Sequence, residues 1–110
     1  MHDLMNRFAW VIFVMAASLE VAGDAAVRRG LRGGGVLSIL AGCALLAGYA
    51  LLVNSVPWDF SKLLGVYVGF FALVSILCGR FVFRETVPPS TWIGLALILA
   101  GGLLIQFGRR

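Results

Sequence analysis

Four long apolar runs follow one another along the chain, and short stretches rich in glycine, proline or charge separate them. The runs cover residues 8–27, 36–53, 62–83 and 91–107. Each is close to the roughly 20 residues with which an α-helix crosses the hydrocarbon core of a bilayer. The pattern therefore predicts an all-α integral membrane protein with four transmembrane helices, and residues 1–110 are expected to form a single transmembrane domain.

The stretches between the runs carry residues that end helices. Four glycines and three arginines separate the first two runs, and Pro57 stops the second. Glu85 lies in the third break, where it is expected only to order the turn before Pro88. Ser90 or Thr91 is expected to cap the fourth helix. We therefore expect a hairpin array of helices joined by short turns.

The composition agrees with lipid as the solvent of most side chains. Of the 110 residues, 61% are hydrophobic and 13% are charged, and the mean hydropathy is +0.99. A soluble domain of this length carries far more polar surface. Four spans use nearly the whole length, so no extramembrane domain is expected. The net charge of +4 comes largely from arginines at the ends of apolar runs, where they anchor helices in headgroups, so nucleic-acid binding is not expected.

The sequence offers little that is typical of metal or enzyme chemistry. Cys43 and Cys78 lie inside apolar runs, where they are expected to act as small packing residues. There is no cluster of cysteine and histidine, so no metal ion or other cofactor is expected. Nor does any serine within the membrane have a histidine in reach, so the chain is not expected to be an enzyme.

Basic residues divide almost equally between the two sides of a four-helix array. One side carries four of them and the other carries five: Arg7, Lys62, Arg109 and Arg110 against Arg28, Arg29, Arg32, Arg80 and Arg84. The excess of positive charge that normally sets orientation is therefore nearly absent. Two interpretations stay open, namely that the rule resolves poorly on short loops or that the chain inserts in both orientations. The second would permit an antiparallel dimer.

Glu20 is the most informative residue, because it lies in the middle of the first apolar run. A charge at this depth of a bilayer costs several kcal/mol unless it is protonated, paired or wetted. The only basic candidates within other spans are Lys62 and Arg80, and both lie near helix ends, where their side chains are expected to reach toward the headgroups. We therefore expect Glu20 to bind a proton or a cation.

Asp24 follows Glu20 by one helical turn, so both carboxylates lie on one face of the first helix. Two poorly solvated carboxylates this close are not expected both to be ionised, and one is expected to gain and lose its proton near physiological pH. Asp24 also has a structural interpretation, since it precedes Arg28 and Arg29 and could pair with either. The sequence leaves these two interpretations of Asp24 open.

Two tyrosines are candidates for the surroundings of Glu20. Tyr49 lies in the second run and Tyr67 in the third. An aromatic ring attracts cations, and a phenol in lipid needs a hydrogen-bond partner, which a carboxylate supplies. Phe70 and Phe71 follow Tyr67 and are expected to serve ordinary packing. Tyr49 and Tyr67 are therefore predicted to take part in binding substrate or protons.

Small residues are dense in the second, third and fourth runs. In lipid no hydrophobic force drives helices together, so close approach at small residues contributes much of the packing. Gly94 and Gly101 are seven residues apart, on nearly one face of the fourth helix across two turns. This face suits a contact with another helix, either within the chain or in a second copy, and the spacing alone does not decide between them.

Three motifs together resemble the small multidrug resistance family of the drug/metabolite transporter superfamily. They are Glu20-Val21-x-Gly23, Val66-Tyr67-Val68-Gly69 and Gly94-Leu95-x-Leu97-Ile98-x-x-Gly101. The resemblance covers nearly the whole chain. It implies an antiparallel, dual-topology homodimer in the bacterial cytoplasmic (inner) membrane, with both copies of Glu20 in one cavity binding substrate and protons competitively.

The resemblance also implies roles for residues outside that cavity. Gly94, Leu97, Ile98 and Gly101 match the dimerisation face of the family. The glycines Gly23, Gly65 and Gly69 match positions of helix packing and conformational change.

The chain also departs from the family pattern. Tyr67 stands where the family usually has tryptophan, Leu64 where a tyrosine is usual, and Asp24 where the residue is usually neutral. A flat aromatic box for planar lipophilic cations is therefore not expected. Two acids in each protomer suit a more highly charged or more hydrophilic cation, such as a polyamine.

The function predicted from these features is a proton-coupled antiporter. It would export small cationic compounds, either drug-like cations, guanidinium-type compounds or polyamines, by alternating access around Glu20. Its partners would be the cationic substrate, protons, the lipid bilayer and a second copy of the chain. Two alternatives stay open: a flippase or exporter of a lipid-linked or amphipathic metabolite, and a non-transporting membrane subunit.

Overall fold

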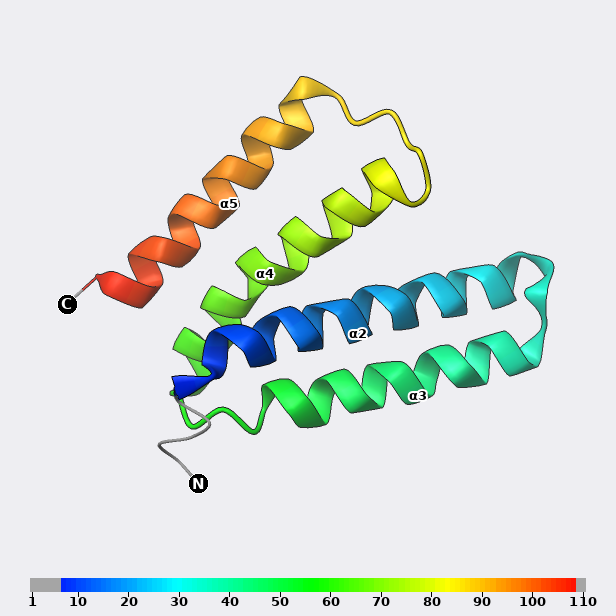
Figure 1. The fold of residues 1–110 in the computed structure, drawn as a ribbon, viewed down its shortest axis with the longest axis horizontal. Helices are drawn as coiled ribbons and strands as arrows, with labels where there is room; N and C mark the ends of the chain where they lie inside the picture. The colour runs from blue at the N-terminus through cyan, green and yellow to red at the C-terminus, as the bar shows by residue number, and fades with distance from the viewer. Residues whose placement is uncertain (1–6, 109–110) are drawn as a thin grey trace. The chain divides into compact units, whose positions relative to one another are not determined.

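The computed structural model describes residues 7–108 of the chain. Four long helices follow one another, and a short π-helical turn comes after the first (Figure 1); they are α2 (Ala9–Arg29), η1 (Gly30–Gly34), α3 (Val36–Val53), α4 (Phe60–Phe81) and α5 (Pro89–Phe107). All four long helices have the length and apolar composition needed to cross a membrane. The prediction of an all-α protein with four transmembrane helices is confirmed. Arg109 and Arg110, which entered the count of charges, lie outside the described residues.

The chain divides into two compact units, residues 1–57 and 58–110. The first holds the α2–α3 hairpin and the second holds the α4–α5 hairpin. A single domain over residues 1–110 stays a prediction.

In the first unit, α2 and α3 approach each other closely at two glycines. A Cβ added to Gly42 would lie 2.6 Å from the carbonyl oxygen of Gly23, and one added to Gly23 would lie 2.8 Å from Cγ of Leu46. Farther along the hairpin, the Ser38 hydroxyl donates a hydrogen bond to the Ala26 carbonyl oxygen over 2.7 Å. The two backbones therefore come into direct contact where Gly23 crosses Gly42, and any side chain larger than hydrogen at these positions would push the helices apart.

The turn between α2 and α3 depends on glycine for its conformation. Gly33 has φ of +105° and Gly35 has φ of +95°, values that residues with a Cβ rarely adopt. Arg28, Arg29 and Arg32 are exposed around this turn. Basic side chains at this position complement the partial negative charge of the α2 C-terminus and fit the headgroup region of a bilayer.

In the second unit, α5 contacts α4 along one narrow face. Ile105 covers Gly65, since a Cβ on that glycine would lie 2.8 Å from Ile105 Cδ1. Leu99 covers Gly69 in the same way at 3.5 Å. Leu95 is the only buried residue of α5, so this helix turns most of its surface away from α4.

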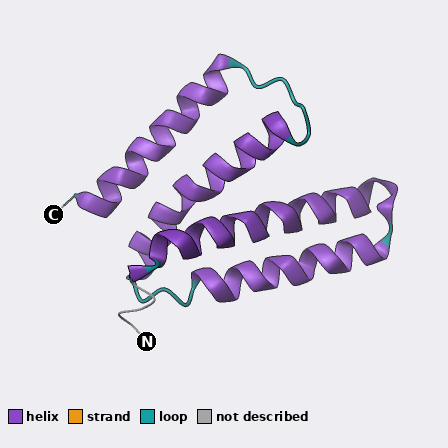
Figure 2. Ribbon diagram, viewed as in Figure 1, coloured by secondary structure: helices purple, strands orange, loops and turns teal. Residues whose placement is uncertain are grey.

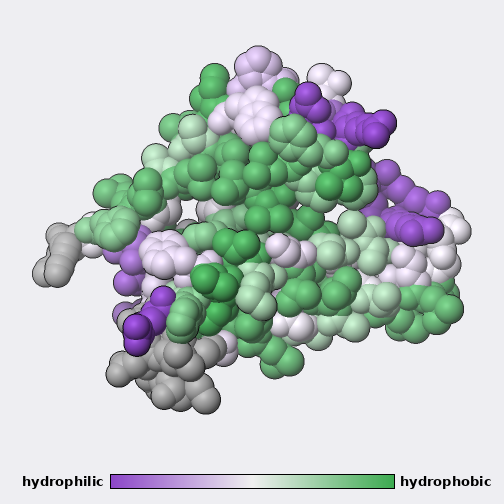
Figure 3. All heavy atoms as spheres, in the orientation of Figure 1, coloured by the Kyte–Doolittle hydropathy of each residue, from purple (hydrophilic) through white to green (hydrophobic). Residues whose placement is uncertain are grey.

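Apolar side chains cover most of the face of the molecule seen in Figure 3. Among the most exposed are Leu37, Leu51, Leu97 and Leu104. Such surfaces would be unfavourable in water but carry no penalty against lipid tails, which are equally apolar. The exposed apolar surface therefore agrees with the assignment of the four helices to a membrane.

The third predicted run differs from α4 by two residues at each end. The helix is Phe60–Phe81 rather than 62–83. It begins early because the Leu63 amide donates a 2.8 Å hydrogen bond to the Asp59 carbonyl, which closes the first turn. It ends early because the Phe83 amide bonds to the Cys78 carbonyl, a wider i to i+5 closure that stops the regular ladder.

The prediction that Ser90 or Thr91 caps the fourth helix is wrong. α5 begins at Pro89, and Pro88 is the residue before it, without a side-chain cap. Proline is well suited to the first helical position because its missing N–H would have no partner there. The Thr91 amide donates to the Pro88 carbonyl over 3.0 Å, which closes the first turn.

The loop between α4 and α5, drawn in teal in Figure 2, folds back onto the end of α4. The Glu85 amide donates a 2.9 Å hydrogen bond to the Gly79 carbonyl. Arg84 adopts φ of +56°, the one positive value found for a residue other than glycine in the described range. This left-handed residue reverses the chain direction so that Glu85 returns to the helix.

Candidate functional site

Glu20 continues the buried stripe of α2. Ala9, Phe13, Ala16 and Ala17 are all fully buried, and their spacing of three to four residues places them on one face of the helix. Glu20 follows Ala16 by four residues and Ala17 by three, so it lies on the same face, and it is half-buried. The helix thus carries its carboxylate on a face made otherwise of small and apolar side chains.

Tyr49 reaches the same region from α3. Gly42 and Leu46 of this helix contact α2 at Gly23. Tyr49 follows Gly42 by seven residues and therefore lies on the α2-facing side, one turn beyond Leu46. It is half-buried. The phenol of Tyr49 is a hydrogen-bond donor on the helix that packs against α2.

The structure brings three of the predicted site residues together within the first hairpin. Gly48, beside Tyr49 in the sequence, faces Leu19, beside Glu20, since a Cβ on Gly48 would lie 3.8 Å from Leu19 Cδ1; Tyr49 therefore lies within electrostatic range of Glu20 and Asp24. Glu20 and Asp24 are one turn apart on α2, with Cβ atoms separated by roughly 5–6 Å. Two carboxylates and a phenol on neighbouring helices form a polar cluster that is suited to a proton or an organic cation.

Asp24 is exposed and lies between Glu20 and the basic turn. Within the described part of the chain, no ion pair joins it to Arg28 or Arg29. The pairing that the sequence left open is therefore not formed in this structure. The Asp24 carboxylate remains accessible to a cation that approaches the hairpin.

Tyr67 belongs to the second unit, where it lies on α4 and is only 3% exposed. Gly69, two residues farther along, is also buried. Tyr67 therefore lies on a different hairpin from Glu20, Asp24 and Tyr49, which belong to α2 and α3.

Within the second hairpin, the glycines of the predicted dimerisation face of α5 are not covered by α4. A Cβ on Gly94 or on Gly101 would meet no atom within 4 Å. Leu97 is 70% exposed and Ile98 is also exposed. The side chains of α5 that reach the α4 glycines are Leu99 and Ile105, and Ile105 lies one turn after Gly101. The contact of α5 with α4 leaves Gly94 and Gly101 uncovered, and the two interpretations of their spacing stay open.

One pocket was not anticipated from the sequence. It lies at the end of the second hairpin, has a volume of about 210 Å³, and is lined by Ser75 and Ile76 of α4, the loop residues Glu85, Thr86, Val87 and Pro88, and Thr91 of α5. Glu85 was expected only to order the turn. One feature of the sequence points to the pocket. Gly79, six residues before Glu85, has no side chain and so leaves room for the side chain of Glu85.

Metal chemistry gains no support from the geometry. Among residues 7–108, no group of three or more histidine, cysteine, aspartate or glutamate side chains is placed to hold a metal ion. Cys43 on α3 and Cys78 on α4 are both free thiols.

Comparison with known proteins gives relatives that span nearly the whole chain. A UPF0060 membrane protein of Pseudomonas paraeruginosa is 33% identical over 108 residues, which cover 96% of this chain and 97% of the relative. A UPF0060 membrane protein of Synechocystis sp. is 31% identical over 99 residues, covering 89% and 92%. The spermidine export protein MdtI of Salmonella paratyphi B is 29% identical over 111 residues, covering 94% and 99%.

These names describe membrane proteins and an exporter rather than enzymes. No family model and no solved structure matches the chain. The similarity to an exporter of this size agrees with the resemblance drawn from Glu20 and the motif of the fourth helix.

Proposed function

Because the chain belongs to the UPF0060 family of membrane proteins and resembles the small multidrug resistance exporters, we propose that it exports small organic cations in exchange for protons. The observation that carries the proposal is the cluster of Glu20, Asp24 and Tyr49 in the first hairpin. The membrane of action is proposed to be the bacterial inner membrane. The relative named as a spermidine exporter supports a cationic substrate over a lipid-linked metabolite.

Exchange follows from the cost of charge in a membrane. A carboxylate such as Glu20 is stable at this depth when it holds a proton or when a cation neutralises it. Because the two ligands compete for one charge, binding of either releases the other. A proton gradient would then drive the cation outward, provided that the site opens to one side of the membrane at a time.

Asp24 is proposed to select cations that carry more than one positive charge. It lies one turn from Glu20 on the same face of α2 and is exposed. Two ammonium groups on one short alkyl chain could each meet one of these carboxylates. Tyr49 is proposed to orient the ligand through its hydroxyl, and Tyr67 to contribute a second phenol to the transport path.

A second copy of the chain is proposed to complete the transporter. Gly94, Leu97, Ile98 and Gly101 of α5 would form the contact between copies, because α4 leaves both glycines of this face uncovered. The near balance of basic residues on the two sides supports opposite insertion of the two copies. Gly23, Gly65 and Gly69 are proposed to let helices slide where backbones pass closely.

The test is transport by purified protein in liposomes under an imposed pH gradient. Spermidine, guanidinium and a quaternary ammonium ion would each be supplied as substrate. We expect flux of at least one of them in the wild type and a fall of at least roughly 100-fold in Glu20→Gln, since that variant cannot ionise. Asp59→Asn, which removes an exposed acid outside the cluster, is the matched control and should transport normally.

Wild-type flux in Glu20→Gln would reject the proposal. A complete lack of flux for every cation in the wild type would instead favour a subunit without transport activity of its own.

A further inference from the structure

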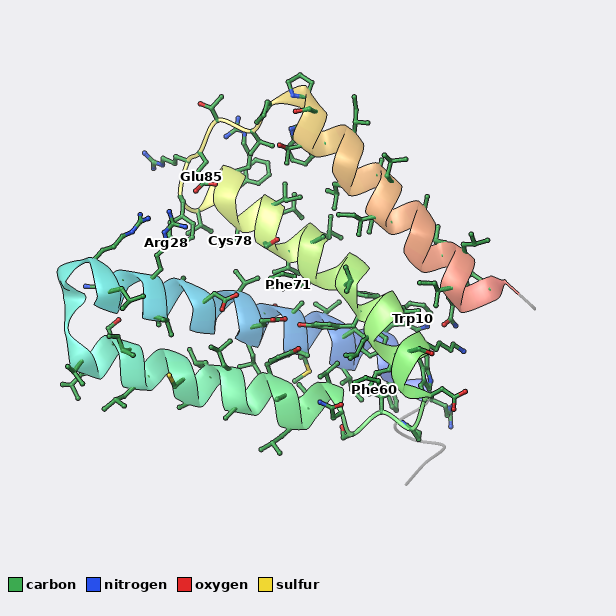
Figure 4. All side chains as sticks on the ribbon, turned by 180° about the vertical axis from the view of Figure 1, so that it is seen from behind. Trp10, Arg28, Phe60, Phe71, Cys78 and Glu85 are labelled. Atoms are coloured by element: carbon green, nitrogen blue, oxygen red, sulfur yellow. The ribbon has the colours of Figure 1, made fainter. Side chains whose placement is uncertain are left out.

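The pocket at the end of the α4–α5 hairpin has a carboxylate fixed at its rim. Glu85 is tied to α4 by the 2.9 Å hydrogen bond from its amide to the Gly79 carbonyl. Its carboxylate lies directly over Gly79, since a Cβ there would be 2.5 Å from Oε1 of Glu85. Figure 4 shows Glu85 beside the C-terminal end of α4, at the same end as Cys78. A larger residue at position 79 would displace the Glu85 carboxylate from this position.

The Glu85 carboxylate is not neutralised by its basic neighbours. Within the described residues it forms no ion pair with Arg80 or Arg84. The guanidinium of Arg80 lies over the ring of Phe81, with Cζ 5.3 Å from the ring centroid. The negative charge at the rim of the pocket is therefore available to a ligand.

The pocket also offers hydroxyl groups as acceptors. The Ser75 hydroxyl donates to the Ala72 carbonyl over 3.0 Å, which leaves its lone pairs free. The hydroxyls of Thr86 and Thr91 form no hydrogen bond within the described part of the chain. Together with Glu85, these groups surround a space of about 210 Å³.

This set of acceptors fits a primary ammonium group. Such a group has three N–H donors and one positive charge, as the lysine side chain does. A carboxylate supplies the charge-assisted bond and the hydroxyls accept the remaining donors. A quaternary ammonium ion has no N–H to donate, an anion is repelled by Glu85, and calcium requires about six to eight oxygen ligands, more than one carboxylate supports.

We propose that the pocket is a second binding site, which takes the primary ammonium group of the cation before or after it passes the membrane. The proposal deepens the proposed function and rests on it for the identity of the ligand. The pocket lies where α4 and α5 are joined, between the last turns of α4, the first turn of α5 and the loop that connects them. Arg80 and Arg84 lower the affinity, so the site binds more weakly than the Glu20 cluster.

The test separates this site from the Glu20 cluster by using Glu20→Gln as the background. Spermidine is titrated calorimetrically into this variant in nanodiscs of zwitterionic lipid, whose headgroups have no net charge to compete for the amine. We expect residual binding with Kd on the order of 1 mM. Adding Glu85→Gln should weaken it by at least roughly 10-fold, and tetramethylammonium should not bind in either variant.

Two further variants in the same background separate position from charge. Gly79→Ala keeps the Glu85 charge but displaces the carboxylate, so it should weaken spermidine binding several-fold, by roughly 3-fold or more. Asp59→Asn removes one exposed negative charge from the other end of α4 and should leave binding unchanged.

The proposal is overturned if Glu20→Gln binds no spermidine, or if Glu85→Gln in that background binds it as tightly as before. It is also overturned if Asp59→Asn weakens binding as much as Glu85→Gln does. The proposed function is judged separately, by transport. A Glu20→Gln protein that binds spermidine weakly but does not transport it supports both, whereas one that transports at the wild-type rate rejects the exporter mechanism alone.

Discussion

The two hairpins of this protein are built from similar lengths of apolar helix, yet they pack very differently. In the first, the backbones of α2 and α3 meet directly at Gly23 and Gly42. In the second, single side chains such as Ile105 reach across to Gly65, and α5 keeps only Leu95 buried. Because apolar surface gains nothing by leaving lipid for protein, only close-fitting surfaces hold membrane helices together. The tight hairpin can hold charged groups in fixed positions, and the loose one leaves a face for another helix.

The largest effect is expected from breaking the tight hairpin at its crossing. In Gly42→Ala the new methyl would lie 2.6 Å from the Gly23 carbonyl oxygen and 2.6 Å from Cγ2 of Val27. Both helices must then move apart, and we expect a loss of about 1–3 kcal/mol in the free energy of unfolding. Reversible unfolding in mixed micelles would measure it.

Gly48→Ala is the matched control for this variant. It lies on the same helix, and its Cβ would be 3.8 Å from Cδ1 of Leu19, an ordinary contact. Equal stability of the two variants would show that the backbones of α2 and α3 are not in direct contact at Gly42.

The open face of α5 should give the next largest effect, on association rather than on folding. In Gly94→Val and Gly101→Val the added Cβ would meet no described atom within 4 Å. We expect the stability of the single chain to change little, while dissociation of the dimer rises by roughly 10-fold or more, or about 1.4 kcal/mol. Fluorescence energy transfer between labelled copies in liposomes measures the dissociation.

If both α5 variants associate like the wild type, this face of α5 is covered by lipid and does not bind another helix. Leu103→Ala, at an exposed position on the opposite side of α5 from Gly94, serves as a control for general effects on α5.

The contributions of Glu20 and Asp24 to cation binding in the first hairpin can be separated by substrate charge. Asp24→Asn is expected to lower the apparent affinity for spermidine by about 5- to 10-fold, because one of two ion pairs to the ligand is lost. The affinity for a singly charged cation should change by less than about 2-fold. Competition assays in liposomes would compare the two substrates. An equal loss of affinity for both would mean that Asp24 does not select for the number of charges on the cation.

The smallest effect is expected from Tyr49→Phe. This change removes the hydroxyl near Glu20 and Asp24 but keeps the ring. Loss of one hydrogen bond of about 1 kcal/mol predicts a rise of roughly 5-fold in the apparent KM, with little change in the maximal rate. Initial rates of transport over a range of spermidine concentrations would show it, and an unchanged KM would place the hydroxyl outside the binding site.

Much of the fold follows from the length and spacing of apolar runs. A run of about 20 residues in lipid must be helical, so the four spans and the place of Glu20 in the middle of the first could be predicted. The helix ends were shifted because local backbone hydrogen bonds at Asp59 and Cys78 decide them. Hydropathy does not encode such bonds.

The pairing of helices could not be predicted in the same way. Gly94 and Gly101 share a face, but whether α4 covers that face depends on how α5 is turned about its axis. Ile105 and Leu99 determine this rotation by fitting over Gly65 and Gly69. The Glu85 pocket was missed for a similar reason, since it needs the loop to fold back through Arg84 onto Gly79.

Whether Glu20 holds either a proton or a cation is tested most directly by the release of protons when a cation binds to purified protein. Spermidine added to weakly buffered wild-type protein should lower the pH of the solution. The release should disappear in Glu20→Gln and persist in Asp59→Asn. Equal proton release from the wild type and Glu20→Gln would contradict the assignment of the exchange to Glu20.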